Sequence, residues 1–312
     1  MGKGRSITVS APGKIHLLGE HSVVYGKPAI LTSVDLRLKV TISQGRTVPN
    51  ELRSLQKIIE RIVKKELKLK KIPLYSLEIS SQIPVGSGLG SSAAVSAAYV
   101  GALLTYLRVE WDLDLINKLA YEAEKVFHGN PSGGDNSTVV YGGLVWFRKE
   151  TPDLKIIQPL DTFFSRSRNF VLIQTGIPKE TTADMVNLVK KLYEKRPQLV
   201  QKFLEEQENL VRQLLSAIKA GHEKEVIRII RAGERNLESI GVASKFAQKI
   251  IRKIEKAGGA AKIIGAGGKK GPSGMLLGYH KNRKVVQKIA KLYNLPYFST
   301  KLEIEGVRKE NT

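Results

Sequence analysis

The chain has 312 residues and 42% hydrophobic content, which predicts one large domain or two moderate ones with a sizeable core. Its 51 lysines and arginines against 29 aspartates and glutamates give a formal charge of +22, which favours anionic partners. The absence of cysteine excludes disulfides, thiolate metal sites and a cysteine nucleophile. The sequence shows no signal-peptide pattern and no run of 18 apolar residues, so we expect a cytoplasmic protein that does not cross a membrane.

The first part of the sequence alternates strand-like and helix-like segments. Alternating apolar positions predict strands, whereas apolar residues at helical spacing predict an amphipathic helix. In chain order the predicted elements are strands over 7–10 and 36–42, a surface helix over 51–71, a strand over 75–83, and a buried helix of small and apolar residues over 93–107.

The rest of the sequence is predicted to be mainly helical. A helix is expected over 112–127, and the turn formers of 128–136 predict an irregular loop before a strand over 137–147. The later elements are a strand over 170–173, a helical region over 182–257 broken near Arg196-Pro197, Ala220-Gly221 and Gly241, strands over 261–264, 275–279 and 297–304, and a basic helix before the last strand.

The segment 84–92 is a loop with three glycines between a predicted strand and a predicted helix. It is no Walker loop, and it departs from a dinucleotide fingerprint because Ser91 follows Gly90 and no suitable acidic residue lies about 20 positions on. Such a loop presents backbone N–H groups at the positive end of a helix dipole, which predicts an anion site. Ser91 and Ser92 stand where an oxygen ligand for Mg²⁺ would be placed; the alternative is a tight turn with serine caps.

Two carboxylates follow this loop along the sequence. Glu124 lies near the end of the predicted helix over 112–127, and Asp135 follows a glycine-rich loop. A carboxylate on a loop can orient a hydroxyl and accept its proton, and one on a helix can bind a metal ion. The alternative is that Glu124 is a solvated helix residue and Asp135 a turn former.

Several motifs stand in a fixed order along the sequence. The first spans 11–29 and includes Gly-Glu-His-Ser-Val-Val-Tyr-Gly-Lys-Pro, and the second spans 84–94 with Gly-Leu-Gly-Ser-Ser-Ala-Ala. His-Gly-Asn-Pro-Ser-Gly-Gly-Asp-Asn follows at 128–136, and Gly-Ala-Ala-Lys-Ile-Ile-Gly-Ala-Gly-Gly at 259–268. In order and spacing these motifs resemble the GHMP family of small-molecule kinases, over nearly the whole chain.

The resemblance implies a fold and a role for each matching residue. The fold would be α+β in two lobes, an N-terminal ribosomal-S5-like lobe over 1–165 and a C-terminal α/β lobe over 166–312. Asp135 would orient and deprotonate the attacking hydroxyl, and Lys14 would stabilise its anionic form. Mg²⁺ would be held by Ser92 and Glu124. The residues matched to the ATP phosphates are Pro84, Gly86, Ser87, Gly88, Leu89, Gly90, Ser91 and Ser92, and those matched to the acceptor are Glu20, His21, Thr182, Gly265, Ala266, Gly267 and Gly268.

The first motif is most similar to the family members that phosphorylate the 5-hydroxyl of mevalonate, with ATP as donor, in isoprenoid precursor synthesis. Phosphomevalonate, or another small alcohol such as galactose or homoserine, is the alternative acceptor within the family, and a homodimer is a family expectation. The third motif departs from the family's pattern at Lys269 and Lys270. These lysines would either add anion affinity at the mouth of the site or lie in solvent on a longer loop.

Nucleic-acid binding is an alternative of a different class. Residues 251–312 hold 14 basic and 4 acidic residues, enough for a footprint on a phosphate backbone. Aromatic residues make up only 6% of the chain, and no helix-turn-helix, zinc or RNP-like wording is found. Such binding would therefore rest on charge alone, as an addition to kinase activity.

Overall fold

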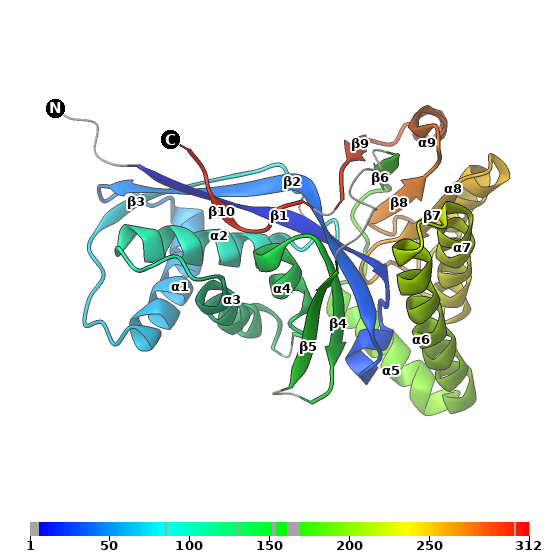
Figure 1. The fold of residues 1–312 in the computed structure, drawn as a ribbon, viewed down its shortest axis with the longest axis horizontal. Coiled ribbons are helices and arrows are strands. Elements are labelled where there is room, and N and C mark those ends of the chain that lie inside the picture. Colours follow the sequence, from blue (N-terminus) through cyan, green and yellow to red (C-terminus); the bar gives the residue numbers. More distant parts are fainter. Residues whose placement is uncertain are drawn as a thin grey trace.

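The computed structural model describes residues 6–84, 86–129, 131–151, 154–160, 169–302 and 304–311. It has two lobes, each built on one antiparallel sheet, and two long strands run from the first lobe toward the second (Figure 1). The predicted α+β class is confirmed. The predicted lobe boundary between 165 and 166 lies outside the described residues.

The sheet of the first lobe is formed mainly by two long strands, β1 (Ile7–Leu18) and β2 (Ala29–Gln44). Both extend beyond the predicted runs, because irregularities in their pairing after Pro12 and after His16 let β1 continue past its proline. The strand order is β10-β1-β2-β4-β5, with β3 paired to β2. The other strands are β3 (Tyr75–Ser81), β4 (Leu144–Lys149), β5 (Lys155–Leu160) and β10 (Arg308–Lys309).

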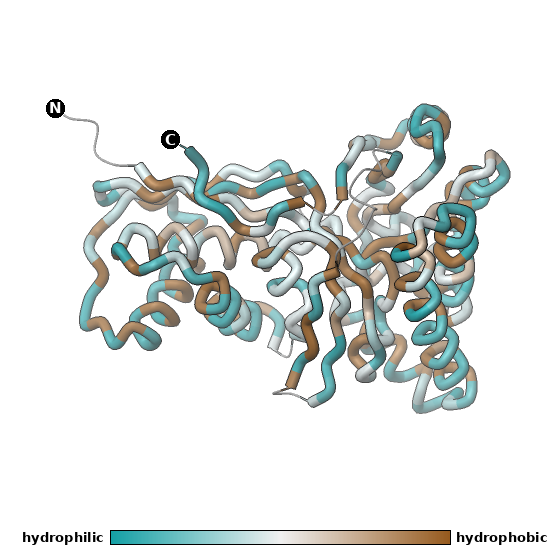
Figure 2. Tube along the Cα trace, viewed as in Figure 1, coloured by the Kyte–Doolittle hydropathy of each residue, from teal (hydrophilic) through white to brown (hydrophobic). Residues whose placement is uncertain are grey.

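Helix α2 (Ser91–Tyr106) lies at the centre of the first lobe, against β1 and β2. Its residues are mostly small, and at Gly101 a Cβ atom would lie 3.2 Å from both Val9 and Trp111, so the helix packs closely on its neighbours. Figure 2 shows α2 pale, with alternating hydrophilic and hydrophobic turns on α1, as expected of a buried and a surface helix. The other elements here are η2 (Asn50–Leu52), α1 (Arg53–Glu66), α3 (Leu113–His128) and α4 (Gly134–Tyr141).

The second lobe has a four-stranded sheet in the order β7-β8-β6-β9. Its strands are β6 (Phe170–Gln174), β7 (Ala260–Ile263), β8 (Met275–Tyr279) and β9 (Tyr297–Thr300). Its helices are α5 (Thr182–Lys195), α6 (Pro197–Lys219), α7 (Glu223–Ser239), α8 (Lys245–Lys256) and α9 (Arg283–Leu292). Within the residues described, no helix is both long and apolar enough to span a bilayer.

The three breaks predicted in the long helical region are confirmed, and each has a local cause. Pro197 is the first residue of α6, where its missing N–H costs nothing. Gly221 and Gly241 follow α6 and α7 with positive φ angles of 67° and 78°. This left-handed conformation ends a helix, and glycine adopts it without the strain that a side chain would cause.

The prediction was wrong over 134–143, where the structure has helix α4 and a turn in place of the end of the loop and the start of the strand. Helix α4 begins at Gly134, so Asp135 lies in a first helical turn, and the strand starts only at Leu144. The hydroxyls of Ser137 and Thr138 donate to the carbonyls of Gly133 and Gly134, four residues back, at 2.7 and 2.8 Å. These bonds give the two polar side chains partners inside a helix. A prediction based on strand propensity takes no account of such bonds.

The end of the chain returns to the first lobe, where β10 pairs with β1. Arg37, a buried residue of β2, holds this segment: its guanidinium donates to the carbonyls of Glu305 and Gly306 at 2.8 and 2.7 Å. The same group donates to the hydroxyl of Ser10 at 2.7 Å and to its carbonyl at 3.1 Å. One buried side chain therefore ties three segments of the sheet together.

We expect Arg37→Met to lower the free energy of unfolding by about 3 kcal/mol or more, because it leaves several buried carbonyls without a donor. Denaturant unfolding measures this loss. Arg228→Met is the matched control, since Arg228 lies on the outside of α7 and pairs with Glu225 at the surface. Equal stability of the two variants would contradict the role given to Arg37.

Candidate active site

The glycine-rich loop 84–92 crosses from β3 to α2. Gly86, Gly88 and Gly90 have positive φ angles of 67°, 76° and 73°. A Cβ atom on Gly88 would lie 3.1 Å from the carbonyl oxygen of Ile264, and one on Gly90 only 2.8 Å from Cγ of Lys14. Gly88 and Gly90 are therefore favoured by both backbone conformation and space, and Gly86 by backbone conformation alone.

The first turn of α2 has no side-chain cap. Its N-cap is Gly90, and Ser91 and Ser92 are already helical, so the alternative of a serine cap is wrong. The first N–H groups of a helix have no intrahelical acceptor and lie at its positive end. The loop and this turn together can thus hold an anion, as the sequence predicts.

Lys14 and Asp135 form an ion pair beside this loop, with Nζ and Oδ2 3.0 Å apart. Lys14 comes from β1, and its backbone N–H donates to the carbonyl of Leu89 at 2.9 Å, which fixes the strand against the glycine-rich loop. Asp135 comes from the first turn of α4 and keeps about a third of its side chain exposed. The two residues predicted to be catalytic are brought together.

The charges around Asp135 keep it ionised. Enclosure by the protein acts to raise the pKa of Asp135, but Lys14 and then His16 outweigh it, so the pKa is lowered. Burial, and next Lys14, lower the pKa of His16 to about 3. The neutral His16 ring has Nδ1 3.4 Å from Nζ of Lys14, so Lys14 lies between a carboxylate and an imidazole.

Ser92 and Glu124 meet next to this pair. The Ser92 hydroxyl donates to Oε2 of Glu124 at 3.2 Å, while Oε1 of Glu124 is buried with no hydrogen-bond partner among the described residues. Burial, and next the charge of Asp135, raise the pKa of Glu124 to about 7. A hydroxyl and an unpartnered carboxylate oxygen are ligands that Mg²⁺ accepts when phosphate oxygens complete its shell, so these residues fit the metal that the sequence predicts.

A pocket of about 240 Å³ lies between the glycine-rich loop and the second lobe. Among the residues matched to ATP or acceptor, its lining includes Gly86, Ser87, Gly88, Thr182, Ala266 and Gly267. The remaining lining residues are Ile177, Pro178, Glu180, Thr181, Ile264, Ser273 and Gly274. The structure therefore brings part of each predicted set to one cavity, whereas the matched residues Pro84, Leu89, Gly90, Ser91, Ser92, Glu20, His21, Gly265 and Gly268 do not line it.

Glu20 and His21 lie behind this pocket and are almost fully buried. The ring Nε2 of His21 is 3.1 Å from the carbonyl oxygen of Ala266, and Glu20 forms an ion pair with Lys262 of β7. The ammonium of Lys262 also donates to the carbonyls of Ile263 at 2.6 Å and His16 at 3.4 Å. Sequence reasoning missed Lys262, although a lysine inside a strand of otherwise small and apolar residues is the signal for a buried partner.

Lys269 and Lys270 are exposed on the loop that follows β7. The loop is fixed by Ser244 and Ser273, whose hydroxyls lie 2.9 Å apart and bond the carbonyls of Gly271 and Gly268. Exposure of both lysines is compatible with either alternative, anion affinity at the mouth of the site or a solvated longer loop.

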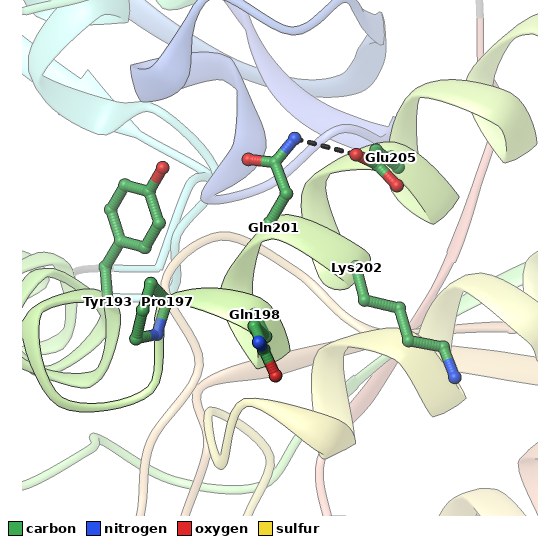
Figure 3. A pocket seen from close by; sticks show the side chains of 6 residues that line it. All are labelled: Tyr193, Pro197, Gln198, Gln201, Lys202 and Glu205. Atoms are coloured by element: carbon green, nitrogen blue, oxygen red, sulfur yellow. Dashed lines mark hydrogen bonds between the residues drawn. The ribbon is translucent and has the colours of Figure 1, made fainter.

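A second concavity at the junction of α5 and α6 carries none of the predicted residues. It is lined by Tyr193, Pro197, Gln198, Gln201, Lys202 and Glu205, with Gln201 donating to Glu205 at 2.8 Å (Figure 3). It has no glycine loop and no carboxylate paired with a lysine, so it lacks the features of a phosphoryl-transfer site.

Comparison with known proteins agrees with this geometry. The model of the GHMP kinases N terminal domain matches residues 54–143, and the chain is 32% identical over 285 residues to a curated relative, covering 88% of this chain and 93% of the relative. The chain belongs to the GHMP kinase family.

That relative is the mevalonate kinase of Archaeoglobus fulgidus. Among solved structures, L. major mevalonate kinase in complex with R-mevalonate matches with a TM-score of 0.79 and 21% identity, over 95% of this chain and 96% of that one. Streptococcus pneumoniae phosphomevalonate kinase in complex with phosphomevalonate and AMPPNP matches with 0.77 and 19%, over 95% and 99%. The fold is therefore shared by kinases of both acceptors.

A buried carboxyl on α7 should make stability depend on pH. Glu234 accepts from the N–H of Ile263 at 2.9 Å, and burial raises its pKa to about 8, with Lys262 opposing and Glu238 and Glu20 adding to the shift. The folded protein thus keeps this proton up to about pH 8, whereas an unfolded glutamate loses it near pH 4.3. Between these values the folded state binds more protons, so this group destabilises the fold increasingly as pH rises.

We expect Glu234→Gln to remove that loss. The stability of the variant relative to the unaltered protein should rise by about 1.4 kcal/mol per pH unit between pH 5 and 8, measured by denaturant unfolding. Glu206→Gln, at an exposed position of α6, is the matched control. Parallel stability curves for the unaltered protein and Glu234→Gln would contradict the expectation.

Proposed function

We propose that this protein is a mevalonate kinase, which transfers the γ-phosphoryl group of ATP to the 5-hydroxyl of mevalonate. The observation that carries the proposal is the Lys14–Asp135 pair, 3.0 Å apart and fixed to the glycine-rich loop through Leu89. The pair provides a carboxylate for a hydroxyl proton and a cation for the charge that develops, beside a place for phosphates.

ATP would bind with its phosphates against the loop 84–92 and the first turn of α2. Backbone N–H groups there need no reorganisation to meet an anion, because glycine conformation and the hydroxyl of Ser87, which donates to Pro84 at 2.6 Å, hold the loop in shape. Phosphoryl transfer depends mainly on such positioning and on charge neutralisation.

Mg²⁺ would be held by Ser92 and Glu124. When bound, the ion would neutralise phosphate charge and orient the transferred group. His128 contributes to this corner: its Nε2 lies 3.1 Å from the Ser92 hydroxyl and 3.6 Å from Oε2 of Glu124. The ring therefore helps to fix the direction of both oxygen ligands.

Asp135 would accept the proton of the attacking hydroxyl. Because its pKa is low, Asp135 is a weak base, so the proton leaves late, when bond formation to phosphorus has made the hydroxyl acidic. Lys14 stabilises the oxygen as negative charge develops, and the His16 ring, with Nδ1 3.4 Å from Nζ of Lys14, lies against its ammonium group.

Mevalonate is favoured over phosphomevalonate because the relative at 32% identity is a mevalonate kinase, while the phosphomevalonate kinase shares the fold at 19%. Thr182, Ala266 and Gly267 line the pocket where the acceptor would enter, with Glu20 and His21 supporting it from behind. We also propose a homodimer located in the cytoplasm.

We expect turnover of mevalonate, and not of phosphomevalonate, galactose or homoserine, in an assay that couples ADP release to a chromogenic reaction with ATP and Mg²⁺. Turnover of phosphomevalonate in place of mevalonate would move the assignment to the alternative acceptor. No turnover of any of the four would overturn the proposal.

We expect Asp135→Asn to lower kcat for mevalonate by about 10²–10⁴-fold, since the amide accepts no proton. Lys14→Met should also lower kcat, because the developing charge loses its cation. Steady-state kinetics measure both effects, and Asp114→Asn, at an exposed position of α3, is the matched control. A kcat of Asp135→Asn equal to that of the control would contradict the role of Asp135.

A further inference from the structure

The chain between α3 and α4 joins two carboxylates with different proposed roles. Glu124, proposed to hold Mg²⁺, lies on α3, and Asp135, proposed to accept the hydroxyl proton, lies in the first turn of α4. Phosphoryl transfer depends on positioning, and a misplacement of about 1 Å can cost about 100-fold in rate. Helix α4 has no side-chain cap, because its N-cap is Gly133. The place of Asp135 therefore depends on what holds Gly133.

Lys155, the first residue of β5, lies directly against this N-cap. A Cβ atom on Gly133 would lie 2.6 Å from Nζ of Lys155 and 3.0 Å from its Cδ and Cε, and Gly133 is buried. The end of the lysine side chain thus covers the backbone of Gly133, in space that a side chain at position 133 would need. This contact couples the place of β5 to the start of α4.

The ammonium group of Lys155 lies over an aromatic ring of α3. Its Nζ is 3.1 Å from the centroid of the Tyr121 ring, within the range of a cation–π interaction. The hydroxyl of Tyr121 donates to the carbonyl of Pro131 at 3.3 Å. Tyr121 therefore contacts the segment 131–133 directly through its hydroxyl and indirectly through Lys155, and it does so from the helix that carries Glu124.

These contacts meet on the residues that come just before Asp135 in the sequence. Neither Tyr121 nor Lys155 lines the pocket between the lobes, and neither has a role in the mechanism above. A displacement of Gly133 would change the direction of the first turn of α4, and with it the distance of 3.0 Å between Asp135 and Lys14. The two side chains are therefore placed to affect the reaction through Asp135.

We propose that Tyr121 and Lys155 are positioning residues, which hold the segment 131–133 and thereby set the place of Asp135 relative to Lys14 and Glu124. The charge at position 155 is needed because an aliphatic side chain would pack on Gly133 without attraction to the ring. This inference rests on the proposed function, since both residues act only through the proposed proton acceptor.

Lys155→Met keeps an unbranched side chain of similar length and removes the cation. We expect it to lower kcat for mevalonate by about 10- to 100-fold and to leave the KM values for mevalonate and ATP nearly unchanged. Lys155→Arg, whose guanidinium also interacts with an aromatic face, should restore most of kcat. Tyr121→Leu should match Lys155→Met, and Tyr121→Phe, which keeps the ring, should lie between. Lys288→Met, at an exposed position of α9, is the matched control.

The same change in an Asp135→Asn background separates positioning from a general effect on the fold. There Lys155→Met should lower kcat no further, because the group that it positions no longer accepts a proton. Denaturant unfolding establishes that each variant is folded under the conditions of the assay. An undiminished loss in this background, or a failure of Lys155→Arg to restore kcat, would overturn the positioning role.

Two further results separate this inference from the proposed function. A kcat of Lys155→Met equal to that of Lys288→Met, together with a large loss in Asp135→Asn, would overturn the positioning role and leave the proposed function standing. Unchanged activity of Asp135→Asn, or no turnover of mevalonate by the unaltered protein, would overturn the proposed function and the positioning role with it.

Discussion

The arrangement of the first lobe around the active site depends on one buried lysine. Lys14 must lose its water shell to lie where it does, which is tolerable only because Asp135 and His16 meet its ammonium group. Its backbone N–H is bonded to the loop that precedes α2, and its side chain fills the space that a side chain on Gly90 would need. Lys14, the residue that would neutralise the charge of the reacting groups, thus also positions β1, the glycine-rich loop and α2.

The two lobes are joined by a second buried cation. Lys262 of β7 bonds Glu20 and the carbonyl of His16, so the strand of one lobe is attached to the strand that carries Lys14 in the other. Buried ion pairs add little to stability, since desolvation cancels most of the attraction, but they are directional. The Lys262–Glu20 ion pair is therefore suited to fixing the orientation of the loop after β7 relative to the glycine-rich loop. The pocket between these two loops depends on that orientation.

Most of the helices and strands, and the residues that carry chemistry, could be predicted from sequence because periodicity and glycine-rich motifs are local signals. Asp135 and Lys14 are 121 positions apart, and only the resemblance to a family could place them together. The start of α4 was missed because serine and threonine bond their own helix backbone there. Lys262 was missed because its partner, Glu20, lies 242 positions away, and the lysine in an apolar strand indicates a buried partner without identifying it.

The return of residues 308–309 to pair with β1 affects how the protein can be made. During synthesis β1 and β2 leave the ribosome well before β10, so the edge of their sheet stays open until residues 308–309 have been translated. An open edge invites pairing with other strands, and contacts between the two ends of a chain form late. The nascent first lobe is therefore most prone to mispairing during synthesis, and its sheet is completed only after the second lobe has emerged.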